Sequence, residues 1–115
     1  MTQFQTCLHH CISLQSYLKD NQTLWLNNAK TSSPKTLQYI IDLSTILDLI
    51  ITHSHPLNLD NMKIILYSLN KLKENKSVHV KALNLPPACV NKNLTDLKSS
   101  ALNDFNSILQ LCPQI

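Results

Sequence analysis

Apolar residues recur every three or four positions along four stretches of the chain, and this spacing predicts amphipathic helices. The first stretch extends from Phe4 to about Leu18. Its apolar positions are Phe4, Cys7, Leu8, Cys11, Ile12, Leu14, Tyr17 and Leu18. The apolar residues 24–26 that follow, with Trp25 at their centre, form either a loose further turn of helix or an apolar plug in a loop.

Two more helices are predicted in the middle of the chain. The second begins at Pro34, because a serine followed by a proline in the first turn is a common helix start, and it ends before Pro56. It is apolar on most of its sides, so we expect it to be the central helix. A third helix follows over residues 59–74, capped by Asn58 or Asp60.

The segment from Ser77 to Val90 is harder to assign. Residues 77–85 alternate between polar and apolar as a strand does, but one isolated strand has no partner with which to pair. We therefore expect an extended crossover or a stray helical turn, continued by Pro86 and Pro87.

The last helix begins near Asn93, with Asp96 in the capping-box position, and ends near Cys112. Together these elements predict an all-α fold with one helical domain over residues 1–115. The expected architecture is an antiparallel four-helix bundle with a proline-containing crossover before its last helix.

The composition is unusual, because the chain has no glycine and its ten basic residues are all lysine. Glycine is the common residue of left-handed turns and helix C-caps, and asparagine is the residue that replaces it most easily there. Asparagines stand where the helical patterns stop, and we expect them to take that role: Asn21, Asn27, Asn28, Asn58, Asn75 and Asn91. Charged residues make up 15% of the chain, against about 25% in ordinary globular proteins. The surface must therefore be largely uncharged and polar.

The net charge of +3 is too mild to indicate nucleic-acid binding, and the chain lacks the arginine forks that read guanine. The short basic run at residues 71–76 is interpreted as the end of a solvated helix. No apolar stretch is long enough to span a membrane. The N-terminus lacks the cationic start and apolar region of a secretory leader, so we expect an intracellular protein if Met1 is the native start, and a secreted one if Met1 was added to a mature chain.

The sequence Cys7-Leu8-His9-His10-Cys11 is the one local group that could bind a metal, with His53 and His55 as further ligands. Its spacing does not match established zinc fingers. Cys7 and Cys11 also occupy core positions of the first helix, where free cysteine packs as a small apolar residue. We therefore interpret them as buried thiols, and we expect no metal site.

The cysteine spacing also limits disulfide bonding. A straight last helix would hold Cys89 and Cys112 roughly 30 Å apart, whereas Cys7 and Cys11 lie about one turn apart. Bridged cysteines need Cα atoms within about 7 Å, so two bridges cannot form together. A single disulfide bond, between Cys7 and Cys112, is compatible with this spacing.

Catalysis finds little support in the sequence. The chain has a single glutamate, Glu74, no paired carboxylates on one helix face, and no glycine-rich phosphate loop. We predict that the protein is not an enzyme and requires no cofactor.

The leading prediction is a non-catalytic helical module that binds another protein or a second copy of itself, as an adaptor, regulator or accessory protein. Its helices are more apolar than one buried stripe requires, and an interface would cover the excess. Trp25, Tyr39 and Tyr67 are the candidate interface anchors, because aromatic residues dominate binding hot spots.

Two alternatives come from other classes. Four helices, a proline-broken crossover and cysteines near the chain ends resemble a secreted short-chain helical bundle of the cytokine kind, though in architecture alone. A helical domain that is stabilised by zinc or binds nucleic acid weakly is the other alternative.

Overall fold

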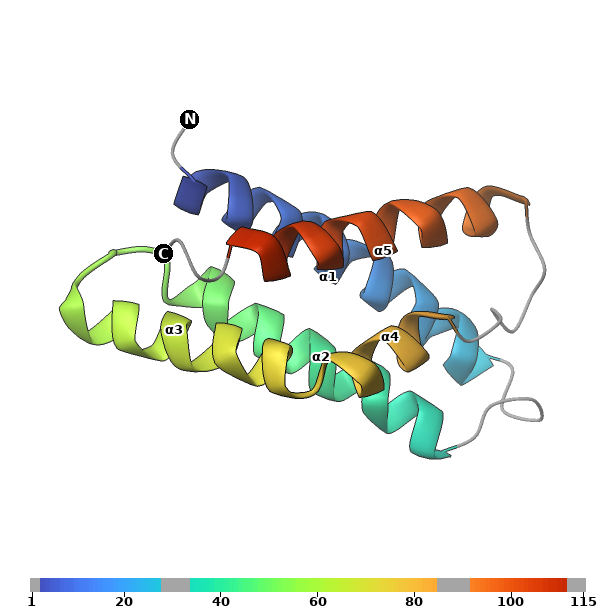
Figure 1. Ribbon diagram of the computed structural model, residues 1–115. Helices are drawn as coiled ribbons and strands as arrows, with labels where there is room; N and C mark the ends of the chain where they lie inside the picture. The colour runs from blue at the N-terminus through green and yellow to red at the C-terminus, as the bar shows by residue number, and fades with distance from the viewer. Residues whose placement is uncertain (1–2, 28–33, 85–91, 112–115) are drawn as a thin grey trace.

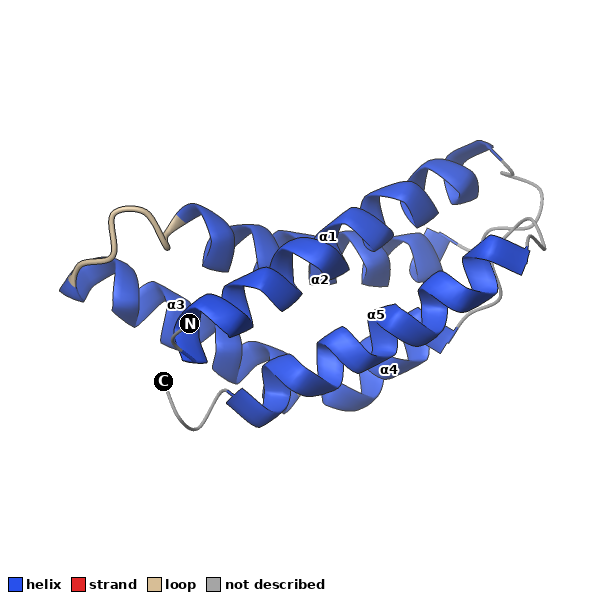
Figure 2. Cartoon of the chain, turned by 90° about the horizontal axis from the view of Figure 1, so that it is seen from above, coloured by secondary structure: helices blue, strands red, loops and turns tan. Residues whose placement is uncertain are grey.

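A computed structural model describes residues 3–27, 34–84 and 92–111 of the chain. Within these ranges every regular element is a helix, which confirms the predicted all-α class (Figure 2). The five helices are α1 (Gln3–Asn27), α2 (Pro34–Thr52), α3 (Leu59–Glu74), α4 (Lys76–Asn84) and α5 (Lys92–Leu111).

The helices lie side by side along one elongated body that measures 45 × 24 × 23 Å (Figure 1). α1 packs against α5 and α2, and α2 also packs against α3 and α4. At 25 residues α1 is about 37 Å long, so it spans most of the body. It continues beyond Leu18 as one helix to Asn27, so residues 24–26 are helical rather than a plug in a loop.

One continuous hydrophobic core is shared by the helices. Each contributes the apolar residues of one face, as the three-four spacing requires. The buried apolar residues are Cys7, Cys11, Leu14, Tyr17, Leu18, Ile40, Leu43, Leu47, Ile50, Ile65, Leu69, Leu72, Leu83, Ala101, Phe105 and Ile108.

The expectation of an extended crossover or a stray turn was wrong for residues 76–84, which form the nine-residue helix α4. The alternation of Val78 and Val80 suggested a strand, but Val78 is exposed and Val80 is only half-buried. His79 and Leu83, four positions apart, are the buried pair, so the helix places a polar residue in the core position. The rest of the predicted crossover, residues 85–90, lies outside the described residues.

Asn75 takes the predicted role of a helix C-cap, at the end of α3, but without the left-handed backbone that was also expected. No described residue has a positive φ angle. Asn58 caps α3 because its side-chain oxygen accepts the backbone N–H of Asn61 at 2.9 Å. Asn75, between α3 and α4, has a φ of −105°, and its side-chain amide donates to the carbonyl of Lys71 at 3.2 Å. Asn58 therefore acts through its side chain, and Asn75 acts through both its side chain and its backbone N–H, which also donates to the Lys71 carbonyl at 3.2 Å. Asn21 lies within α1 rather than at its end, and Asn28 and Asn91 lie outside the described residues.

Candidate functional site

The predicted interface anchors lie in different settings. Tyr67 projects from α3 and is 61% exposed, with the ammonium of Lys71 5.4 Å from the centre of its ring. Tyr39 of α2 is half-buried and lines a groove between α2 and α4. Trp25 lies near the end of α1, but its side chain is outside the described part of the structure, so its role stays a prediction.

Tyr67 belongs to an exposed surface on α3 that also carries aliphatic and basic side chains. α3 uses Ile65, Ser68, Leu69 and Leu72 to face the rest of the protein. Residues three or four positions apart are neighbours on a helix, so the opposite side forms one continuous strip. The name α3 outer face is given to five residues of this side, Leu59, Lys63, Ile64, Tyr67 and Lys71; the same side also exposes Asp60, Asn70 and Glu74.

The α3 outer face exposes more apolar surface than its position requires. Leu59 is 74% exposed and Ile64 is 36% exposed, and Leu57, in the loop just before the helix, is 47% exposed. Singly exposed apolar side chains are ordinary, but several on one strip are a feature of interaction surfaces. The strip faces outward because α3 packs mainly on α2 (Figure 1).

The positive charge of the protein is concentrated in the same region. Residues 59–84 contain five lysines, against only Asp60 and Glu74 as acidic residues. The rest of the chain contains five lysines and five acidic residues, so the net charge of +3 comes entirely from α3 and α4. Lys63 and Lys71 lie beside the apolar strip, but Lys71 pairs with Glu74 at 3.5 Å, and two of the three net positive charges lie on α4.

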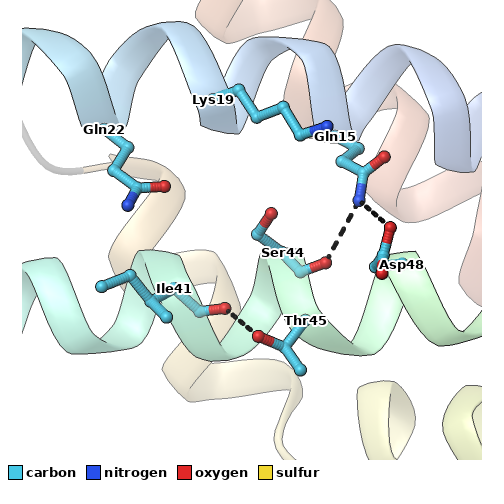
Figure 3. Close-up of a pocket in the computed structure, with 7 residues that line it drawn as sticks. All are labelled: Gln15, Lys19, Gln22, Ile41, Ser44, Thr45 and Asp48. Carbon is cyan, nitrogen blue, oxygen red and sulfur yellow. Dashed lines mark hydrogen bonds between the residues drawn. The ribbon is translucent and has the colours of Figure 1, made fainter.

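A polar pocket of about 350 Å³ lies between α1 and α2 (Figure 3). Its lining residues are Gln15, Lys19 and Gln22 from α1 and Ile41, Ser44, Thr45 and Asp48 from α2. The buried side-chain amide of Gln15 donates to Asp48 Oδ1 at 3.2 Å and to the carbonyl of Ser44 at 3.4 Å. These bonds hold the two helices in register. The lining offers amide, hydroxyl, ammonium and carboxylate groups for hydrogen bonding.

Two adjoining pockets lie between α2 and α4. The first measures about 320 Å³ and is lined by Tyr39, Asp42, Ile46, Asn75, Val78 and His79. The second measures about 240 Å³, and it shares Tyr39 and Val78 with the first and adds Ser77 and Lys81. The Asp42 carboxylate accepts a hydrogen bond from Gln38 at 2.8 Å. Tyr39 therefore lies in a groove beside α4 rather than on an open face.

A polar contact joins α1 to α5. His10 Nδ1 and Asp104 Oδ1 are 2.8 Å apart, and both side chains are mostly buried. His10 thus meets a carboxylate 94 residues away in the chain, a contact that no local pattern reveals.

Cys7 and Cys11 are free thiols with fully buried side chains, in agreement with the prediction of core cysteines. The hydrogen bond with the Cys7 thiol and the burial of the side chain raise the pKa of the Cys11 thiol, so Cys11 stays protonated at neutral pH. Cys112, the predicted disulfide partner of Cys7, lies outside the described residues, so that bridge stays a prediction.

We expect Cys7 and Cys11 to resist alkylation in the folded protein, because thiolate formation and reagent access both require exposure. Intact mass after iodoacetamide treatment, with and without urea, measures this. Both thiols should become labelled in urea without any reductant. Labelling in urea that also requires prior reduction would contradict this expectation and would support a Cys7–Cys112 bridge.

Within the described residues, no group of three or more His, Cys, Asp or Glu side chains is placed to hold a metal ion. No described helix is both long enough and apolar enough to cross a membrane. No protein family, no curated protein and no solved structure matches this chain.

Proposed function

We propose that the protein is a non-catalytic helical module that binds another protein through the α3 outer face. The observation that carries the proposal is the strip of exposed apolar side chains, Leu59, Ile64 and Tyr67, on a helix with three lysines and two acidic residues, next to α4 with two further lysines. Aromatic and aliphatic anchors surrounded by charge are typical of protein interfaces.

The proposed scaffold is an antiparallel four-helix bundle in which α3 and α4 together take one of the four positions. The packing of α1 against α2 and α5, and of α2 against α3 and α4, supports this arrangement. In such a bundle the inner side of α3 is fixed by the core, and its outer side is left for a partner.

The partner is expected to be an acidic segment of another protein with apolar residues on one side. Lys63 and Lys71 lie beside the apolar residues of the α3 outer face, and the ammonium of Lys71 is 3.5 Å from Glu74 Oε2. Carboxylates at the rim of a bound segment would therefore meet Lys63 and would compete with Glu74 for Lys71. Because exposed charges are screened by salt, we expect such a complex to form faster and bind more tightly at low ionic strength.

A second copy of the chain suits this surface less well. In a twofold symmetric dimer the same patch meets itself, so the lysines of one copy would face the lysines of the other. Like charges held opposite each other at an interface oppose association. The proposed partner of the α3 outer face is therefore a different, acidic protein.

Selection from a displayed library of random 16-residue peptides tests the proposal. We expect enrichment of acidic peptides with apolar residues at helical spacing, and loss of their binding to a Leu59→Asp, Tyr67→Asp variant. Enriched peptides that bind this variant equally well, or a library that yields no binders, would overturn the proposal. A concentration-dependent dimer in sedimentation, lost in the same variant, would replace the acidic partner with a second copy.

A further inference from the structure

His79 is a buried ionisable residue whose ring has no polar partner among the described residues. It is 4% exposed, and neither ring nitrogen has a hydrogen-bond partner in the part of the chain that the structure describes. The ring packs edge-on against Phe105 of α5, with 5.9 Å between ring centres and 73° between ring planes. A neutral imidazole is tolerated in such a setting, but a charged imidazolium would be buried without a partner.

Helix α4, which carries His79, depends on few buried residues. It has nine residues, and those of its described side chains that enter the core are His79 and Leu83, with Val80 packed at the edge. Lys76, Ser77, Val78 and Lys81 are exposed. Helices this short are marginal in water without tertiary packing, so α4 stays helical because it is docked.

The groups around His79 determine how it responds to acid. Burial lowers the pKa of the imidazole from its usual 6.5, and the negative charge of Asp42 on α2 opposes only part of that effect. From α5 the neighbour is the uncharged ring of Phe105, and the described carboxylate of that helix, Asp104, is paired with His10. The other described charged residues of these helices are Asp48 on α2, Asp60, Lys63, Lys71, Lys73 and Glu74 on α3, and Lys76 and Lys81 on α4.

We propose that α4 is an acid-sensitive latch, in which protonation of buried His79 by solvent releases α4 from α2 and α5. The pocket lined by Asp42, Asn75 and His79 gives water a route to the edge of the ring. Once α4 is released, the imidazolium is hydrated and Phe105 loses its cover.

The pH range over which α4 is released follows from the direction in which folding changes the pKa of His79. The folded pKa lies below 6.5, so the released state binds more protons than the docked state at acidic pH. Docking of α4 is therefore complete above pH 6.5 and weakens as the pH falls from 6.5 toward the folded pKa. Between pH 7.5 and pH 5.0 the released population should rise by up to about 30-fold, the limit set by a released pKa of 6.5.

Hydrogen exchange measured by mass spectrometry tests the latch. Protection factors, which correct for the intrinsic pH dependence of exchange, should fall for α4 amides between pH 7.5 and pH 5.0, by up to about 30-fold. The amides of α1 should keep their protection. A His79→Phe variant keeps an aromatic ring against Phe105 but cannot be protonated, so its α4 protection should not change.

Three results would overturn the proposal. They are unchanged α4 protection in the wild type, an equal fall in the His79→Phe variant, or a fall shared by every helix, which would indicate global unfolding. If His79→Phe does not fold, His79→Leu serves as the non-titrating variant, with the same outcomes.

Discussion

Replacing Phe105 with alanine is expected to destabilise the protein by about 3–5 kcal/mol, the usual cost of removing a fully buried aromatic ring. Phe105 is among the largest side chains with no exposed surface, and its ring supports that of His79. The substitution would leave a cavity between α4 and α5. Small domains are stable by only about 5–15 kcal/mol, so much of the stability would be lost.

Urea unfolding followed by the helical circular dichroism signal measures this loss. Phe105→Leu should cost much less, because it keeps most of the apolar volume. Leu59→Ala is the matched surface control, and with 74% of its side chain exposed it should change stability by less than about 0.5 kcal/mol. A Phe105→Ala protein as stable as the Leu59→Ala protein would show that the described core is wrong.

Replacing Tyr67 with alanine is expected to weaken binding of a selected acidic peptide by about 2 kcal/mol or more, roughly 30-fold, as for other aromatic hot spots. Tyr67 is 61% exposed and lies in the middle of the α3 outer face, with Leu59 and Ile64 on one side and Lys71 on the other. Stability should stay within about 0.5 kcal/mol, because little buried surface is removed.

Ile12→Ala is the control for this prediction. Ile12 is an exposed aliphatic residue of α1, 47% exposed, and it is not part of the α3 outer face. Calorimetric titration should give the same dissociation constant for Ile12→Ala and the wild type. If Tyr67→Ala binds as tightly as the wild type, or if Ile12→Ala loses affinity to the same extent, the proposed surface is wrong.

Local signals were enough to predict most of the helices. Pro34 is the first residue of α2, and α3 has the predicted range of 59–74 with Asn58 as its cap. α5 extends from Lys92 to Leu111, so it begins one residue before the predicted start at Asn93. Caps, prolines and three-four spacing act within a few residues, so they can be recognised in the sequence.

The features that could not be predicted depend on long-range packing. α4 was missed because a polar residue, His79, takes a core position, and its ring is accommodated by Phe105, 26 positions later. The contacts of His10 with Asp104 and of Gln15 with Asp48 likewise join different helices. Tyr67 was predicted as an interface anchor because it is aromatic, but its exposure beside Lys71 follows only from how α3 packs on α2.

The central claim is that the α3 outer face binds an acidic partner, and a footprint of a bound peptide tests it most directly. Hydrogen exchange of the protein with and without a selected acidic peptide should show added protection over residues 59–71. The dissociation constant should also rise as sodium chloride is raised from 50 to 300 mM. Added protection confined to the pocket between α1 and α2, or to the groove between α2 and α4, would contradict the claim, and so would an affinity that salt does not change.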